Sequence, residues 1–149
     1  MPSLFDPQVN QSIRQRIEQL TPESTARWGK MNVAQMLAHL NTVLQLATGD
    51  KSFKPNLIGI VLGPWIKRMV LNEKPYKQNL PTAPSFVVAD SRVFAAEKQH
   101  LLITFQQFIN DGENAAEGRK HPIFGKLTAA EWGFSQWKHF DHHLQQFGV

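Results

Sequence analysis

Residues 128–147 read TAAEWGFSQWKHFDHHLQQF and predict the helix around which the rest of the chain is organised. Thr128 and Glu131 match a capping box, in which the threonine oxygen and the glutamate carboxylate each accept a hydrogen bond from a free backbone N–H. Apolar residues recur along this segment on one side of a helix: Trp132, Trp137, Phe140, Leu144 and Phe147. We therefore expect an amphipathic helix over 129–147.

The same segment holds three of the six histidines of the chain within five residues. A helix advances by about 100° per residue, so His139 and His143 lie about 40° and one turn apart on the same face. Two imidazoles at this spacing can reach one metal ion, as in the helical histidine pair of zinc proteases. Because this face also carries Trp132 and Gln136, we expect it to point inward or toward a cleft.

Three more segments have helical periodicity. The first covers residues 7–20, with Asp6 as its N-cap and Pro7 at its first position, where the missing N–H costs nothing. The second covers 33–48 and lies between Asn32, a good cap, and Gly49, a natural stop.

The third covers 91–110, with Asp90 as its cap, Val93 in its core face and Asp111-Gly112 as its end. The Pro- and Gly-rich stretch 50–89 precedes it, and 57–71 within that stretch could form one or two short helices around Gly63-Pro64. Phe86-Val87-Val88 is the only short β-like run. Four amphipathic helices most simply pack as an antiparallel bundle, so we predict an all-α protein with one domain over 1–149.

Composition excludes several classes of protein. The chain has no cysteine, which excludes disulfides, thiolate metal sites and cysteine nucleophiles. The net charge of +4 comes from scattered lysines and arginines, so we expect no nucleic-acid partner. The sequence shows neither a signal peptide nor a run of about 18 apolar residues, and we expect a cytoplasmic protein without a membrane partner.

A third metal ligand must come from a second helix, and His39 is the candidate. It lies in the middle of 33–48, at the edge of the apolar stripe beside Met36 and Val43. Three neutral imidazoles would leave coordination positions open, as in catalytic rather than structural sites. From spacing alone other interpretations stay open: His39 as a hydrogen-bonded core residue, and the later pair as part of a solvated helix end.

The remaining histidines are expected to have other places. His142 lies about 100° around the helix from His143 and should face solvent or a flank of the helix. His100 should lie on the exposed side of its helix, and His121, which precedes Pro122, should orient the backbone of a loop.

Two segments resemble motifs of a known superfamily. Residues 139–143 (HFDHH) resemble the terminal histidine motif of the DinB/YfiT-like superfamily of metalloenzymes, and residues 33–40 (VAQMLAHL) resemble its second-helix motif. Three further segments are similar to an uncharacterised bacterial branch, a domain of unknown function: 27–32 (RWGKMN), 81–84 (PTAP) and 121–128 (HPIFGKLT). The resemblance covers nearly the whole chain.

The resemblance implies a four-helix bundle with a long crossover between the second and third helices. It also implies the metal ligands, which are His39 from the second helix and His139 and His143 from the fourth; His142 belongs to the motif but is not carried over as a ligand. The metal could be zinc, nickel, iron or manganese, since imidazole suits several divalent ions. By analogy we also expect a homodimer.

Characterised members of the superfamily include transferases that use low-molecular-weight thiols. The resemblance therefore implies a metal-dependent enzyme, a thiol-dependent transferase or a hydrolase, that acts on a small molecule. A chain without cysteine fits a thiol supplied by a cosubstrate. Gln136 and Asp141 are candidates to orient a ligating imidazole.

The alternative is a non-catalytic, stress-related protein that binds a metal or another small ligand. Four basic residues flank the motifs and could receive an anionic ligand: Arg27, Lys30, Lys120 and Lys126. They could equally be solvated surface. Some members of the superfamily are induced by DNA damage, but induction is not binding, so a role on DNA is the weakest hypothesis.

Overall fold

The computed structural model describes residues 1–53 and 57–149, apart from the side chains of residues 57–60. Its helices are α1 (Pro7–Gln19), α2 (Val33–Thr48), α3 (Leu57–Val70), α4 (Phe94–Ala116) and α5 (Ala129–Gln146). A 3₁₀ helix, η1 (Pro84–Phe86), and two short strands, β1 (Lys120–His121) and β2 (Gly125–Lys126), complete the elements. The described part of the chain is thus mainly helical, which confirms the predicted all-α class.

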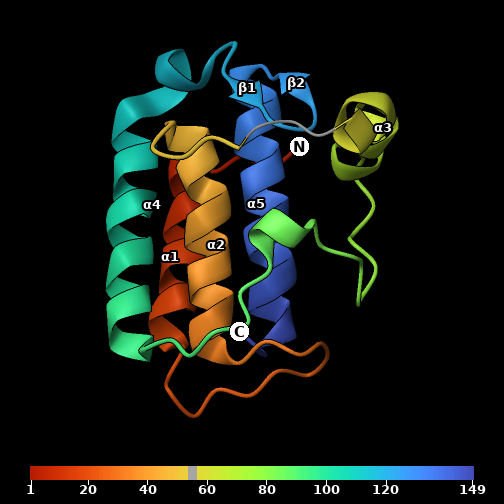
Figure 1. The fold of residues 1–149 in the computed structure, drawn as a ribbon. Coiled ribbons are helices and arrows are strands. Elements are labelled where there is room, and N and C mark those ends of the chain that lie inside the picture. Colours follow the sequence, from red (N-terminus) through yellow and green to blue (C-terminus); the bar gives the residue numbers. More distant parts are fainter. Residues whose placement is uncertain (54–56) are drawn as a thin grey trace.

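The long helices α1, α2, α4 and α5 lie side by side, and α3 lies to one side of them, beyond α5 (Figure 1). Polar contacts between described residues connect α3 to α5. Lys67 forms an ion pair with Glu131 at 2.8 Å, and Nζ of Lys138 donates a hydrogen bond to the carbonyl of Val70 at 3.0 Å. Among the described residues, no helix is long and apolar enough to cross a membrane.

The predicted helix caps at Asp6, Asn32 and Thr128 are confirmed. The Asp6 carboxylate accepts hydrogen bonds from the first turn of α1. Asn32 and Thr128 each form a reciprocal capping box, with Gln35 and Glu131 respectively. These helix starts depend on residues three positions apart, so local sequence is sufficient to define them.

The start of α4 differs from the prediction. The helix begins at Phe94 rather than at residue 91, and its N-cap is Val93, whose side chain forms no capping hydrogen bond; the Asp90 carboxylate pairs with Arg92 at 3.1 Å. Val93, which we expected in the core, is 70% exposed. Gly112 interrupts the helical backbone with φ 71° and ψ −175°, close to the predicted end, and a further turn continues to Ala116.

The region before α4 holds two more findings. Residues 57–70 form a single helix that continues through Pro64. The short β-like run Phe86-Val87-Val88 forms no strand, because Pro84 begins a 3₁₀ turn that ends at Phe86. The strands are instead β1 and β2, an antiparallel pair in which Lys120 lies opposite Lys126; the sequence analysis did not predict it.

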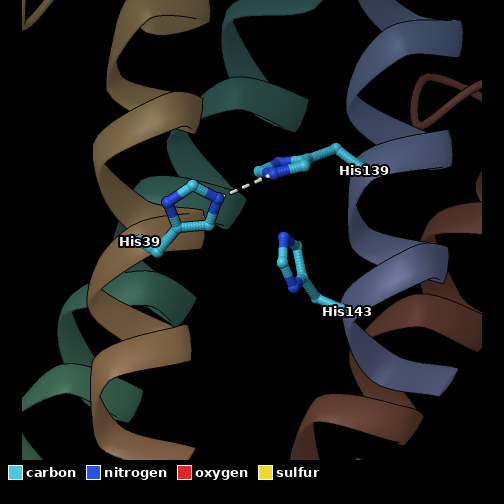
Figure 2. A group of neighbouring side chains, drawn as sticks. All are labelled: His39, His139 and His143. Carbon is cyan, nitrogen blue, oxygen red and sulfur yellow. Dashed lines mark hydrogen bonds between the residues drawn. The ribbon is translucent and has the colours of Figure 1, made fainter. Parts of the chain in front are cut away.

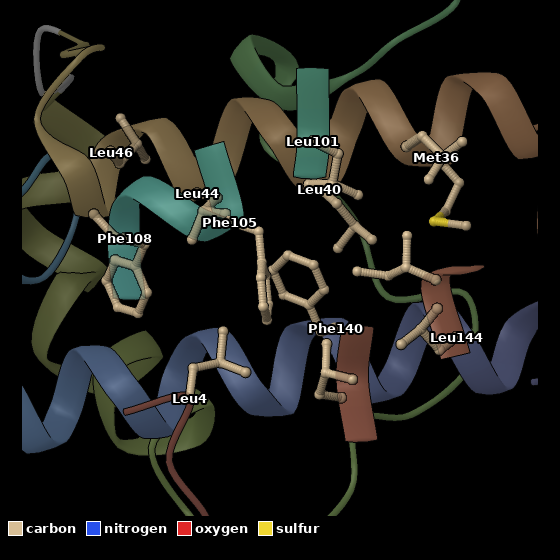
Figure 3. Close-up of a cluster of buried hydrophobic side chains, with 14 of the residues drawn as sticks. Leu4, Met36, Leu40, Leu44, Leu46, Leu101, Phe105, Phe108, Phe140 and Leu144 are labelled. Carbon is tan, nitrogen blue, oxygen red and sulfur yellow. The ribbon is translucent and has the colours of Figure 1, made fainter. Parts of the chain in front are cut away.

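The core lies between α1, α2, α4 and α5, and Figure 3 shows the part where α2, α4 and α5 face one another. Phe105 on α4 and Phe140 on α5 pack edge to face, with ring centroids 5.6 Å apart. Leu40 of α2, Leu101 of α4 and Leu144 of α5 are fully buried around them. This packing holds α2 against α5 and so determines which of their polar side chains meet.

Candidate metal centre

Three histidines from two helices meet in one place: His39 of α2, and His139 and His143 of α5 (Figure 2). Each offers one ring nitrogen, and these nitrogens all lie within 4.8 Å of one another. The Nε2 atoms of His39 and His139 are 3.0 Å apart. A group of this composition and size could bind a metal ion.

His39 is oriented from outside the cluster. Its Nδ1 lies 2.8 Å from the carbonyl oxygen of Phe86, the last residue of η1. A carbonyl oxygen only accepts hydrogen bonds, so Nδ1 carries the proton. In the neutral ring Nε2 therefore has a free lone pair, and this atom faces the other histidines (Figure 2).

His143 is oriented in the same way by an amide. Nε2 of Gln146 donates to the backbone carbonyl of Trp28 at 2.6 Å, so Oε1 of Gln146 is the atom that faces Nδ1 of His143 at 2.8 Å. An amide oxygen accepts, which places the ring proton of His143 on Nδ1. Its Nε2 is therefore unprotonated in the neutral ring.

His139 has fewer fixed contacts. Because Nε2 of His39 is an acceptor, the Nε2–H of His139 donates to it at 3.0 Å. Nδ1 of His139 is buried and has no hydrogen-bond partner among the described residues, and the same holds for Oε1 of Gln136. Buried polar atoms without a partner are rare and costly, and at a functional site they often mark a missing ion or water.

Burial keeps the three rings neutral. It lowers the pKa of His143 to about 3, despite the hydrogen bond to Gln146, which raises it. Burial likewise lowers the pKa of His39, and lowers that of His139 well below its usual value, with smaller contributions from the neighbouring histidines. Neutral imidazole is the form that binds metal ions, so the rings have no net charge to lose at pH 7, although the proton of His139 must move from Nε2 to Nδ1 if Nε2 is to bind the ion.

The two residues predicted to orient an imidazole have different surroundings. The Asp141 carboxylate forms an ion pair with Arg16 at 2.8 Å and accepts from Nε2 of Gln145 at 2.7 Å, rather than contacting an imidazole. Gln136 is almost fully buried on the same helix face as His139. The sequence analysis missed Gln146, although its position three residues after His143 is a detectable signal.

The other histidines lie outside the cluster. His142 is half-buried on the flank of α5, with its ring centroid 5.8 Å from that of Trp28 and 5.6 Å from that of Tyr76. His100 is exposed, as predicted. His121 orients a loop, as predicted: its Nδ1 accepts hydrogen bonds from two backbone N–H groups, at 3.1 and 3.3 Å.

The four basic residues considered for an anionic ligand are all exposed and do not gather. Lys120 and Lys126 face each other in the hairpin that precedes α5. Arg27 lies at the other end of α5, where its backbone N–H donates to the carbonyl of Gln146, and Lys30 follows three residues later. The structure therefore does not bring the four together into one site.

A family model described as "Protein of unknown function (DUF1569)" matches residues 6–148, nearly the whole chain. No curated protein and no solved structure matches the chain.

Proposed function

We propose that this chain, which belongs to the DUF1569 family of proteins of unknown function, binds one divalent metal ion through His39, His139 and His143 and uses it in catalysis. The observation that carries the proposal is the convergence of these rings. Their ring nitrogens lie within 4.8 Å of one another, and the outer nitrogens of two rings are already held by protein acceptors.

The donor set fits a divalent ion. Two nitrogens that share a tetrahedral zinc ion at about 2.0–2.1 Å lie about 3.4 Å apart. The Nε2 atoms of His39 and His139 are slightly closer than this, at 3.0 Å. The three ring nitrogens as a group are spread over at most 4.8 Å, slightly more than a bound ion requires. Small side-chain movements are therefore sufficient, and zinc, nickel, iron and manganese all accept imidazole.

The hydrogen bonds around the rings have the form typical of metal sites. A ligating histidine donates its other ring N–H to an oxygen, which fixes the ring and its tautomer. The carbonyl of Phe86 and the amide of Gln146 do this for His39 and His143.

His139 would complete the pattern through Gln136. When Nε2 of His139 is a ligand, the ring proton resides on Nδ1 and needs an acceptor. Oε1 of Gln136, one helical turn earlier, is buried and without a partner among the described residues. We therefore assign Gln136, one of the two candidates to orient an imidazole, the role of orienting His139 when the ion is bound.

The proposal extends to the fold. We interpret α1, α2, α4 and α5 as the four-helix bundle of the DinB/YfiT-like superfamily, in a single domain. The side-by-side arrangement of these helices supports this interpretation, as does the long connection between α2 and α4 that contains α3 and η1 (Figure 1). The three histidines also lie on α2 and α5, the two helices that the resemblance implies.

For the chemistry, we favour a thiol-dependent transferase or a hydrolase that acts on a small molecule. A bound divalent ion supplies a Lewis acid that lowers the pKa of a nearby thiol or water. The chain has no cysteine, so a thiol would arrive as a low-molecular-weight cosubstrate. The ring of His142 lies beside that of His143, with centroids 5.1 Å apart, and the rings of Trp28 and Tyr76 in turn lie against His142.

The test starts from protein stripped of metal with a chelator. Calorimetric titration should show one ion bound per chain, and no binding by His39→Ala. Metal-loaded protein is then assayed for conjugation of low-molecular-weight thiols to electrophiles and for hydrolysis, with His39→Ala as the control. Turnover that requires both the metal and His39 supports the proposal. Tight metal binding without turnover would instead favour the non-catalytic binding protein.

A further inference from the structure

We propose that the loop of residues 27–29 positions the ring of His143 through Gln146, and thereby sets the metal affinity of the centre although it holds none of the three histidines. The inference rests on the proposed metal site for its effect on affinity. That the loop positions the imidazole of His143 is inferred from hydrogen bonds within the protein alone and does not require a metal ion. Gln146 is the positioning residue.

Gln146 is held at both its backbone and its side chain. Its carbonyl accepts a hydrogen bond from the backbone N–H of Arg27 at 2.8 Å, and its Nε2 donates to the carbonyl of Trp28 at 2.6 Å. Only 3% of the residue is exposed, so these bonds are largely shielded from solvent. With Nε2 engaged by the loop, Oε1 is directed to Nδ1 of His143 at 2.8 Å.

The backbone of Gly29 lies so close to the side-chain amide of Gln146 that no Cβ atom fits between them. Gly29 has φ +83°, and a Cβ atom added there would lie 2.5 Å from Nε2 of Gln146. Any side chain at this position would therefore displace the amide. Trp28, next to it, also contacts the histidine side of α5, with its ring 5.8 Å from that of His142.

The position of the amide matters because it selects the tautomer of His143. While Oε1 accepts from Nδ1–H, the Nε2 lone pair is free for a metal ion. If the amide moves, nothing holds the proton on Nδ1, and rings protonated on Nε2 must give up that proton before they can bind. Loss of such an outer partner typically weakens metal binding about 10–100-fold.

The experiment compares Gly29→Ala with Gly118→Ala. Both glycines have positive φ, +83° and +71°, but a Cβ at Gly118 meets nothing within 4 Å, so that variant controls for backbone strain alone. Two quantities are measured: the dissociation constant for Zn²⁺ by competition with a chelator, and the tautomer of His143 by ¹⁵N NMR in metal-free protein. Gly29→Ala should weaken Zn²⁺ binding about 10–100-fold and populate the Nε2–H tautomer. Gly118→Ala should change neither quantity.

Gln146→Leu removes the two side-chain hydrogen bonds, to Trp28 and to His143, and leaves a side chain of similar volume. It should also weaken Zn²⁺ binding and populate the Nε2–H tautomer of His143. If Gly29 acts through Gln146, the double variant should bind Zn²⁺ no more weakly than Gln146→Leu alone. Additive losses, or an unchanged His143 tautomer in Gly29→Ala and in Gln146→Leu, would overturn the inference. Wild-type protein that binds no Zn²⁺ would contradict the proposed function, whereas the tautomer measurement would still decide this inference.

Discussion

The Nε2 atoms of His39 and His139 lie 3.0 Å apart, although 100 positions separate the two residues in the chain. The contact exists only where α2 and α5 pack side by side, so it depends on the folded core around Phe105 and Phe140. Metal binding by these residues and folding of the chain should therefore be linked, because the unfolded chain has no such site.

His39→Ala should abolish metal binding and also destabilise the metal-free protein. The substitution removes the donor for the Phe86 carbonyl and leaves a buried acceptor without a partner, a loss of about 1–3 kcal/mol. Urea denaturation in the presence of a chelator measures this cost. His100→Ala, at an exposed histidine, is the matched control and should leave both metal binding and stability unchanged. A metal affinity for His39→Ala equal to that of the wild type would remove this residue from the ligand set.

A bound ion should raise the free energy of unfolding, because the three nitrogens converge only in the folded state. Metal at about 100 times its dissociation constant should add about 2.7 kcal/mol. Thermal unfolding with and without the ion measures the gain, and a chelator should reverse it. We expect no gain for His143→Ala, which lacks one ligand. An equal gain in that variant would mean that the ion binds elsewhere.

His121 should make stability depend on pH. Burial lowers the pKa of His121 to about 4, and its Nδ1 accepts two backbone hydrogen bonds that protonation would break. In the unfolded chain a histidine titrates near about 6.5, so the unfolded state binds the extra proton between these values. The stabilisation by the neutral ring is complete above pH about 6.5 and is lost as the pH falls toward 4.

His121→Asn tests this linkage, because an asparagine oxygen also accepts from backbone N–H groups two and three residues later but does not titrate. Between pH 7 and pH 4, the wild type should lose about 2–3 kcal/mol more than the variant. Urea denaturation at each pH, with chelator present, gives the two curves. Parallel curves would mean that His121 does not contribute.

Phe140 should be among the most sensitive positions of the core. It is fully buried against Phe105, and it directly follows His139. Phe140→Ala should cost about 3–5 kcal/mol, because it leaves a cavity between α4 and α5. Ile103→Ala, at a side chain that is 58% exposed, should change stability by less than about 0.5 kcal/mol. Equal costs at the two positions in chemical denaturation would contradict the packing described here.

Local chemistry explains which features were predictable from the sequence. The caps at Asn32 and Thr128 involve partners three residues away, and the spacing of His139 and His143 follows from helix geometry. The start of α4 was missed because Asp90 has the residue type of an N-cap, whereas in the structure its carboxylate pairs with Arg92 and the helix begins at Phe94.

Other features depend on tertiary contacts. The acceptor for His39 is the backbone carbonyl of Phe86, 47 residues away. Every residue has a backbone carbonyl, so the sequence does not indicate which one lies near His39. Gln146 links the carbonyl of Trp28 to the ring of His143, and Trp28 lies far from both residues in the chain. The two-residue strands β1 and β2 are too short to show the alternation by which strands are recognised.

X-ray absorption at the edge of the bound metal tests the central claim most directly. The protein is loaded with one equivalent of Zn²⁺, and the spectrum is compared with that of His143→Ala. The account predicts three imidazole nitrogens at about 2.0–2.1 Å in the wild type and fewer in the variant. A first shell without imidazole nitrogens, or wild-type protein that retains no zinc, would contradict it.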